Sequence, residues 1–553
     1  MSNKEISKKF RLLAALMELH DENAFKIKSY ANAAYAIERL SSAVADLPPH
    51  ELSAVQGIGT AIGEKIAALL DKGSFPLLDQ LLGKTPDGIV KMLDIKGIGP
   101  KKIKVLWQEL GIENMGELLY ACNENRLVAL SGFGAKTQDN IRQSIEYAQA
   151  NASKFRYATL ADEVQQWLAK IRVLPQIARA ETSGELRRQC EVLSEATILL
   201  APTETLDETA QAALSQQIVE LLPETSLLHH WAATRIAWTN PDDFERTWLL
   251  QTAHPAHLQQ LGGAAALAHL NATTETDLYA QLDLPYLPPE LREGRHEIAF
   301  ARQQPLTDLV QLNHLRGVIH AHSTYSDGRH TLQKMAEYCR QAGYDYLGIS
   351  DHSKAAFYAN GLSVERVAEQ HREIDVLNQQ LAPFRIFKGI EADILNDGAL
   401  DYDPETLSRF DFVIASVHSN LKMTEEKAMS RLLRAIENPY TRLLGHPTGR
   451  LLLSREGYPI DHRRIIDACA ANGVAIELNA NPYRLDIDWR WIDYCTEKGV
   501  WISINPDAHS IEGISDMQYG VIAARKGLLT RALTLNAQST ANIAAFFARQ
   551  ERL

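Results

Sequence analysis

Histidine and carboxylate residues recur in the C-terminal half of the chain at spacings typical of metal ligands. His320 and His322 are two residues apart, and Asp507 and His509 repeat that spacing. On an extended strand, residues i and i+2 point to the same face, so both members of each pair can reach one ion. Mixed imidazole and carboxylate ligands suit Zn, Mn or Fe, and do not suit a calcium site built from oxygen alone.

The complete set of candidate ligands contains nine residues, which follow short apolar runs. They are His320, His322, Asp327, His352, Glu391, His418, His446, Asp507 and His509. Nine ligands exceed what one tetrahedral or octahedral ion accepts, so we expect two or three divalent ions. Such ions activate water and neutralise phosphate charge, which predicts hydrolysis of phosphate esters. A lone strand-end histidine is more often a hydrogen-bonded core residue, but nine such residues argue against that interpretation.

The elements that must position these residues are short apolar runs separated by helical segments. The β-like runs are residues 317–320, 346–350, 412–417, 474–478 and 501–504. This alternation predicts repeated β/α units with a parallel sheet or barrel over residues 314–553. In β/α barrels the active site lies at the C-terminal ends of the strands, where the candidate ligands fall.

Several motifs in this region resemble the polymerase-and-histidinol-phosphatase (PHP) domain. The stretches that carry the resemblance are residues 320–328, 349–352, 389–393, 416–419, 445–450 and 507–509. The resemblance implies a distorted (β/α)7 barrel with a trinuclear centre and phosphoesterase activity, and all nine ligand positions of that family match. Arg450 and Lys422 are candidate phosphate-binding cations, with a solvated surface charge as the alternative for each.

The first 150 residues have the helical spacing of apolar residues, interrupted by three similar glycine turns. The turns contain Gly57 and Gly59, Gly97 and Gly99, and Gly132 and Gly134. No strand precedes them, so a dinucleotide-binding fingerprint is excluded and the helix-hairpin-helix is favoured. Its turn exposes backbone N–H groups at a helix N-terminus, where a DNA phosphate binds without sequence readout. Lys101 and Lys102 add positive charge at the second turn; a plain turn between helices is the alternative for any single copy.

The order of these parts resembles bacterial family X DNA polymerases, strongly at both ends of the chain and weakly between them. The residues that carry this resemblance are 23–34, at the start of a lyase-like domain, and 284–295, at the junction with the PHP domain. It implies four regions: a lyase-like helical domain with a helix-hairpin-helix (1–85), a second helical DNA-binding domain (86–150), a palm- and thumb-like α+β region (155–300) and the PHP domain (314–553). Lys65 matches the lysine that forms a Schiff base in members with lyase activity, although a lone helix-surface lysine is more often structural.

The middle region departs from the family pattern, because the carboxylates that hold two Mg ions are missing. The D-x-D pair has become Glu195-Ala196-Thr197, and the third strand, residues 232–237, carries no carboxylate. One displaced glutamate cannot bridge two Mg ions. We therefore expect the polymerase core to be degenerate and to serve as a scaffold.

Composition limits the remaining possibilities. The 553 residues carry a net charge of −12, so contact with nucleic acid must use local basic surfaces or backbone amides. Five scattered cysteines without C-x-x-C pairing suggest reduced thiols, and no window is apolar enough to span a membrane, which predicts a cytoplasmic protein.

These features together predict a DNA-binding, metal-dependent phosphoesterase of DNA repair. The expected reaction is that of a 3′-5′ exonuclease, a 3′-end processing enzyme or an abasic-site endonuclease, acting on nicked, gapped or 3′-ended DNA. The main alternative is an active gap-filling family X polymerase with an attached nuclease. A DNA-binding adaptor with a structural metal centre and a small-molecule phosphatase remain further alternatives.

Overall fold

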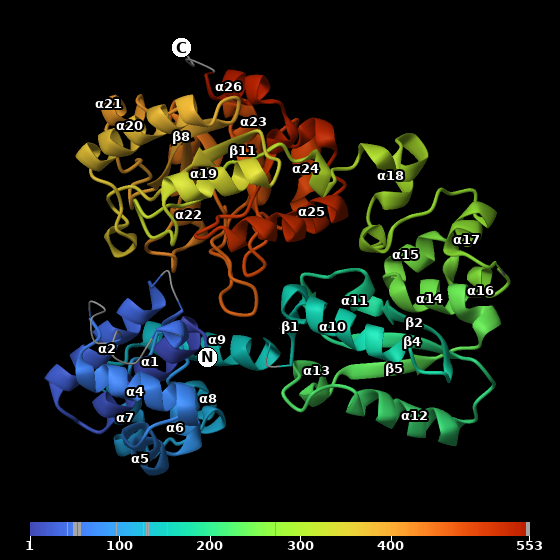
Figure 1. The fold of residues 1–553 in the computed structure, drawn as a ribbon, viewed down its shortest axis with the longest axis horizontal. Helices are drawn as coiled ribbons and strands as arrows, with labels where there is room; N and C mark the ends of the chain where they lie inside the picture. Colours follow the sequence, from blue (N-terminus) through green and yellow to red (C-terminus); the bar gives the residue numbers. More distant parts are fainter. Residues whose placement is uncertain are drawn as a thin grey trace. The chain divides into compact units, whose positions relative to one another are not determined.

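The computed structural model describes residues 1–40, 43–47, 52, 57–95, 97–124, 126–128, 130, 132–151, 153–270 and 272–548. Their contacts divide the chain into two compact units, Met1–Ala152 and Ser153–Leu553. Figure 1 colours these units from blue at the N-terminus to red at the C-terminus. None of the helices in the described part of the chain combines the length and the hydropathy of a membrane span.

All regular secondary structure among the described residues of the first unit is helical. Its α-helices are α1 (Asn3–Leu19), α2 (Ala24–Glu38), α4 (Thr60–Lys72), α5 (Pro76–Lys84), α6 (Asp87–Met92), α7 (Pro100–Leu110), α8 (Met115–Asn123) and α9 (Ala135–Asn151). One hydrophobic cluster contains residues from the whole unit, including Phe10, Ile66, Ile103 and Ile141. The regions predicted as 1–85 and 86–150 therefore share one core.

Local sequence signals fix where these helices begin and end. Ser2 and Glu5 form a reciprocal capping box at the start of α1, which satisfies backbone donors that have no partner inside the helix. Pro100 occupies the first turn of α7, where its missing N–H costs nothing. The same helix ends at Gly111, whose φ of +64° is readily adopted by glycine.

The second unit begins with an α+β region built on a three-stranded mixed sheet. Strand β4 (Ala196–Pro202) is central, with β2 (Ile177–Ser183) antiparallel on one side and β5 (Thr234–Trp238) parallel on the other. A short antiparallel pair, β1 (Phe155–Arg156) and β3 (Val192–Leu193), lies outside this sheet. The helices of the region are α10 (Tyr157–Ile171), α11 (Gly184–Arg187), α12 (Glu208–Glu220), α13 (Leu227–His230), α14 (Phe244–Thr252), α15 (Pro255–Gln260), α16 (Gly263–Leu267), α17 (Glu275–Gln281) and α18 (Glu297–Gln303).

The proline-rich segment predicted as a domain junction lies inside the second unit. Leu284, Leu287 and Leu291 are buried in one hydrophobic cluster, and Arg292 is fully buried. The Arg292 guanidinium donates to both carboxylate oxygens of Glu275, at 2.7 and 2.8 Å. Residues 284–292 therefore form a packed irregular segment and are not a free linker.

A seven-stranded parallel sheet forms the rest of the second unit. Its order is β12-β11-β10-β9-β8-β7-β6, so each strand pairs with its neighbour in sequence. The strands are β6 (Gly317–Val318), β7 (Tyr346–Ile349), β8 (Arg385–Asp393), β9 (Phe412–Ser416), β10 (Thr441–Leu444), β11 (Ala475–Asn479) and β12 (Ile502–Asn505). A bridge between Ala321 and Ala508 joins the chain after the first strand to the chain after the last. The sheet is therefore a nearly closed (β/α)7 barrel, and this part of the fold prediction is confirmed.

Helices pack around the barrel and against one end of it. They are α19 (Leu332–Gln341), α20 (Val364–Gln380), α21 (Pro404–Leu407), α22 (Glu425–Ile436), α23 (His462–Asn472), α24 (Ile492–Glu497), α25 (Met517–Lys526) and α26 (Thr540–Phe547). In α26, Phe546 and Phe547 form a cluster with Phe387 and Phe412 of the strands. These apolar side chains fill one part of the barrel, while buried polar side chains such as His320 and Glu391 lie where the strands end. Figure 1 shows the helices arranged around the strands.

Ion pairs join the α+β region to the barrel, and those of Glu293 are buried. Lys526, at the end of α25, lies 2.6 Å from Glu293, and the same carboxylate accepts from Arg188 at 3.2 Å. Glu191 accepts from Arg490 at 3.0 Å. The Lys526 side chain is 1 % exposed, so loss of its partner would leave a charge in a poorly hydrated position.

Candidate metal centre

The nine candidate ligands converge at the C-terminal ends of the barrel strands. His320 and His322 follow β6 and are both fully buried. The His322 N–H donates to Ala508 O at 2.8 Å, which fixes the chain after β6 against the chain that carries Asp507 and His509. Residues separated by almost 190 positions thus meet because the barrel brings its first and last strands together.

Glu391, at the end of β8, lies at the centre of the cluster. It is 1 % exposed, and nitrogen atoms of five histidines lie between 3.0 and 3.7 Å from its carboxylate oxygens. The five are His320, His322, His352, His418 and His446. Two oxygens cannot accept linear hydrogen bonds from all five imidazoles, so the arrangement suits a carboxylate shared between cations.

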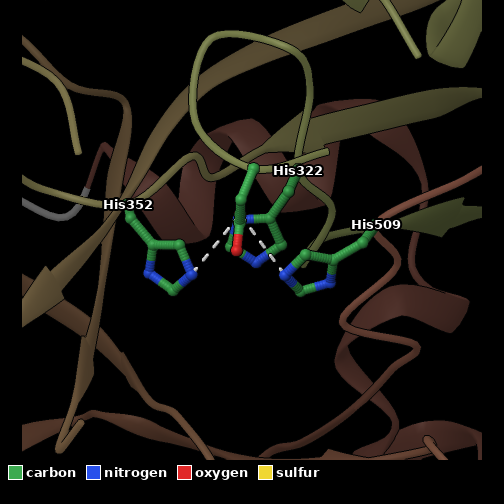
Figure 2. A group of neighbouring side chains, drawn as sticks. His322, His352 and His509 are labelled. Carbon is green, nitrogen blue, oxygen red and sulfur yellow. Dashed lines mark ion pairs between the residues drawn. The ribbon is translucent and has the colours of Figure 1, made fainter. Parts of the chain in front are cut away.

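A second group lies on the more exposed side of the cluster. His322, His352 and His509 point toward one another in Figure 2, and the ring centre of His322 is 4.5 Å from that of His352 and 4.2 Å from that of His509. Asp327 Oδ1 lies 3.7 Å from His352 Nε2 and 3.4 Å from His509 Nε2. The Ser-Asp-Gly turn that carries Asp327 therefore brings this carboxylate to the same rim.

Three overlapping groups of the described residues can each hold a cation. The groups are His322, Asp327, His352 and His509; His320, His322 and Glu391; and His352, Glu391 and His418. In each group, one donor atom per residue lies within 4.8 Å of the others. His320 Nε2 and Glu391 Oε2 are buried without a hydrogen-bond partner within the described chain. Buried polar atoms are normally satisfied, so these two indicate a missing ligand, and the donor set fits a divalent metal.

The electrostatics of the cluster follow from packing carboxylates among imidazoles. Burial opposes ionisation of Glu391, but His418, His320 and His352 outweigh it and hold the pKa of Glu391 well below its ordinary value. Burial likewise opposes the charged form of His320, yet Glu477, Glu391 and Asp507 raise its pKa well above the ordinary value.

The remaining imidazoles differ in pKa according to their neighbours. Burial, assisted by repulsion from His509 and His352, lowers the pKa of His322 to about 4. Burial opposes the charged form of His418, but Glu391 and Asp393 raise its pKa to about 10. A lowered pKa favours the neutral imidazole, which is the form that can bind a metal.

Glu477 supports the cluster from behind and was not among the predicted site residues. It is fully buried in β11, its Oε1 lies 2.6 Å from His320 Nδ1, and its Oε2 accepts from the His446 N–H at 2.8 Å. A carboxylate behind a ligating histidine fixes the ring orientation and the tautomer. The only signal in the sequence is a glutamate inside the apolar run of residues 474–478, where a buried charge needs a partner.

Two further carboxylates play comparable supporting roles. Asp393 bonds to His418 Nδ1. Asp351, fully buried beside His352, accepts from the N–H groups of Ser323 and Ser326 at 2.8 and 3.1 Å. Asp351 therefore holds the turn that delivers Asp327.

Two of the candidate ligand positions have a left-handed backbone conformation. His446 has φ of +23° and Asp507 has φ of +52°, although neither is glycine. Such conformations cost about 1–3 kcal/mol and persist where the surrounding structure enforces them, often at functional sites.

The two cations predicted to bind phosphate lie in different environments. Arg450 donates to Arg484 O at 3.0 Å and to Asp488 at 2.5 Å, and it also bonds to Leu485 O, so its guanidinium is committed to the loop after β11. Lys422 is exposed. Arg484, which the sequence did not single out, lies nearer the centre, with Nε 3.6 Å from Asp507 Oδ2.

The glycine turns of the first unit end at helix N-termini. The first glycine of each pair has a positive φ: +90° at Gly57, +96° at Gly97 and +82° at Gly132. The second glycine of the first two pairs caps the next helix, with Gly59 before α4 and Gly99 before α7; the third pair ends with Gly134 directly before α9. These turns leave N–H groups at the start of a helix, as an anion site requires.

The lysines predicted to act beside these turns differ in exposure. The Lys101 side chain is 86 % exposed at the start of α7. Lys102 Nζ lies over the Phe133 ring, 5.2 Å from its centre. Lys65, the predicted lyase lysine, donates to Ala61 O at 3.2 Å and lies 5.7 Å from the centre of the Tyr30 ring.

In the α+β region, the strands expected to carry polymerase carboxylates present few of them. Glu195 precedes β4 and lies 3.4 Å from Thr197 Oγ1. Thr197 pairs in register with Arg235 of β5. Arg235 lies on the strand next to β4, and its guanidinium donates to Ala232 O at 2.5 Å.

Three family descriptions match the chain. "Helix-hairpin-helix domain" matches residues 1–75 and "SAM-like Helix-hairpin-helix tandem" matches residues 89–146. "PHP domain" matches residues 319–481, which contain seven of the nine candidate ligands.

Relatives of the chain fall into two groups. The DNA polymerase/3′-5′ exonuclease PolX of Bacillus subtilis is 33% identical, and the alignment covers 100% of both chains. A probable phosphatase of Acetivibrio thermocellus is 29% identical over 34% of this chain and 78% of its own. A probable phosphatase of Caldicellulosiruptor saccharolyticus is 27% identical over 34% of this chain and 78% of its own.

Proposed function

Because the chain belongs to the bacterial family X DNA polymerases that carry a C-terminal PHP domain, we propose that it hydrolyses phosphodiester bonds of DNA at the barrel cluster. The reaction we propose is 3′-5′ exonuclease or related 3′-end processing in DNA repair, with abasic-site cleavage as a variant of the same chemistry. The observation that carries the proposal is the shared position of Glu391 among five histidines.

In this proposal the nine predicted residues hold two or three ions of Mn, Zn or Fe. Divalent ions at such a site lower the pKa of water and neutralise charge on a phosphate ester. Glu391 would be a ligand to these ions, and Glu477 and Asp393 hold the rings of His320 and His418 in position to bind them. Arg484 is the cation best placed to contact substrate phosphate, ahead of Arg450 and Lys422.

The hairpins of the first unit supply the DNA contact. Contacts between helix N-termini and phosphates hold the backbone without reading sequence, which suits an enzyme that acts at nicks, gaps and 3′ ends. The net charge of −12 means that this contact must be local, through the turns and lysines such as Lys101.

We further propose that template-directed synthesis has been lost. Two Mg ions need bridging carboxylates, whereas this region offers Glu195 beside Thr197, with Arg235 on the adjacent strand. An active gap-filling polymerase with an attached nuclease is the second candidate, favoured by the full-length similarity to the Bacillus subtilis protein.

One experiment decides between the two. A 5′-labelled primer annealed to a longer template, supplied with dNTPs and either Mg or Mn, is expected to become shorter, with no extension. Nicked, gapped, recessed and abasic duplexes in the same assay identify the preferred end. Extension that disappears in Glu195→Ala would establish the second candidate instead, and an unchanged primer on every substrate would contradict the nuclease.

DNA binding is expected to depend on the second hairpin. Lys101→Glu with Lys102→Glu should weaken binding on all DNA sequences alike and flatten the slope of log K against log salt by about two, because each lost phosphate contact contributes about one. Fluorescence anisotropy over a salt series measures both effects.

Lys72→Glu with Lys84→Glu is the matched control. It makes the same charge change at the C-terminal turns of α4 and α5, away from the glycine turns. Equal weakening by both double variants would show a general charge effect, and no weakening by the first would mean that this hairpin does not contact phosphate.

A further inference from the structure

Two consecutive aromatic side chains are exposed near the candidate metal centre. Phe357 is 84 % exposed and Tyr358 is 48 % exposed. Their ring centres are 5.9 Å apart in a T-shaped arrangement, within the short helical turn Phe357–Ala359. Exposed aromatic rings of this size present apolar surface that a ligand can cover.

The turn belongs to a loop that begins and ends at the ligand His352. The chain leaves after His352 and returns at Leu362, whose N–H donates to His352 O at 2.9 Å. The two ends of this loop are therefore joined beside a candidate metal ligand.

The loop is held at several points, so its aromatic tip has a defined position. The Ala355 N–H donates to Asp401 Oδ2 at 2.6 Å. The Asn360 side chain donates to Ser326 O at 3.3 Å, in the turn that carries Asp327. Tyr402 donates its hydroxyl hydrogen to Leu362 O at 2.5 Å. A fixed aromatic surface binds with less loss of conformational entropy than a mobile one.

We propose that Phe357 and Tyr358 stack against the nucleobase of the 3′-terminal nucleotide and hold it while the adjacent phosphodiester lies at the metal centre. This inference rests on the proposed nuclease function and names residues that bind its substrate. Aromatic rings stack on any base, because every base presents a π face, which suits an enzyme without sequence preference.

A protein partner is a weaker explanation of the same rings. A stable protein interface buries about 800 Å² on each partner. Two neighbouring rings offer far less, about 150–250 Å² each when fully covered. The other strongly exposed large apolar side chains among the described residues 310–548 are Leu312, Val376 and Tyr483, which lie in separate segments of the sequence.

The test uses the full-length protein and two single-stranded oligonucleotides that differ at the 3′ end. One ends in adenosine and the other in an abasic tetrahydrofuran residue. With the adenosine end, Phe357→Ala is expected to raise KM about 5- to 100-fold, which corresponds to the loss of one stacked base. With the abasic end, wild type and Phe357→Ala should have the same KM.

Further variants separate stacking from general hydrophobic contact. Phe357→Trp should retain the wild-type KM, and Phe357→Leu, which is apolar but has no π face, should resemble Phe357→Ala. Val376→Ala, at an exposed apolar position of α20, is the control and should leave KM unchanged. The proposal would be overturned if Phe357→Ala raised KM equally for both oligonucleotides. A wild-type KM in Phe357→Ala with the adenosine-ended oligonucleotide would also overturn it.

A binding measurement keeps this test independent of hydrolysis. An oligonucleotide with 2-aminopurine at its 3′ end should lose fluorescence on binding to wild type, because stacking quenches it, but not on binding to Phe357→Ala. Quenching without any hydrolysis would retain the stacking surface and reject the nuclease. Hydrolysis with equal fluorescence in wild type and Phe357→Ala would retain the nuclease and reject the stacking surface.

Discussion

Glu391→Gln is expected to reduce hydrolysis of a 3′-ended oligonucleotide at least about 10³-fold, while DNA binding stays within about twofold of wild type. The substitution preserves volume but removes the charge shared by five surrounding histidines. Metal ions supply several kcal/mol of transition-state stabilisation, and each 1.36 kcal/mol is tenfold in rate. Single-turnover kinetics measure the rate, and inductively coupled plasma mass spectrometry should find fewer ions per chain.

Glu405→Gln provides the control for Glu391→Gln. The Glu405 side chain is 83 % exposed on the same barrel and pairs only with Arg409 among the described residues. The Glu405→Gln variant should have the activity and metal content of wild type. If Glu391→Gln kept full activity and its metal, the barrel cluster would not be the catalytic site.

Glu275→Gln is expected to lower the free energy of unfolding by about 3–5 kcal/mol, because it leaves two buried arginines without their counter-charge. Arg187 and Arg292 each contact both carboxylate oxygens, at 2.6–2.8 Å. The side chains of the three residues are 7 % exposed or less. Urea denaturation at pH 7 measures the difference, with nuclease activity at low temperature as a check that the barrel remains folded.

The same carboxylate predicts how stability depends on pH. Burial opposes its ionisation, but hydrogen bonds from Arg292 and Arg187 prevail and lower the pKa of Glu275 from 4.5 to about 2. A lowered folded-state pKa means that the contribution is complete above about pH 4.5 and is lost as the pH falls toward 2. The difference in free energy of unfolding between wild type and Glu275→Gln should therefore shrink as the pH falls from about 4.5 toward 2. A constant difference between pH 5 and pH 2.5 would contradict the assignment.

The barrel, and the convergence of the candidate ligands at one rim, were predictable because both rest on local sequence patterns. Short apolar runs followed by histidine or carboxylate recur along the C-terminal half, and parallel strands bring such residues to one rim. Two strands were missed for a physical reason: β8 contains Arg385 and Lys388, and β10 contains Arg442, so neither is uniformly apolar. These long side chains reach polar partners, such as Asp375 for Lys388 and Phe547 O for Arg442.

The supporting residues could not be predicted from spacing, because their roles depend on contacts distant in sequence. Glu477 meets His320 across 157 positions, and Arg484 meets Asp507 across the rim. The buried path of residues 284–292 was likewise hidden, since proline and leucine occur equally in exposed linkers and in packed irregular segments. The contact between Arg292 and Glu275 shows that this segment is packed and is not an exposed linker.

The ion pairs between the α+β region and the barrel bear on how this protein can evolve. Under the proposed loss of template-directed synthesis, residues such as Thr197 and Arg235 can change without cost to the remaining activity. Arg188, Glu293 and Lys526 cannot, because removal of any one of them leaves a buried charge between the α+β region and the barrel. Selection on these contacts would then retain the α+β region independently of its own chemistry.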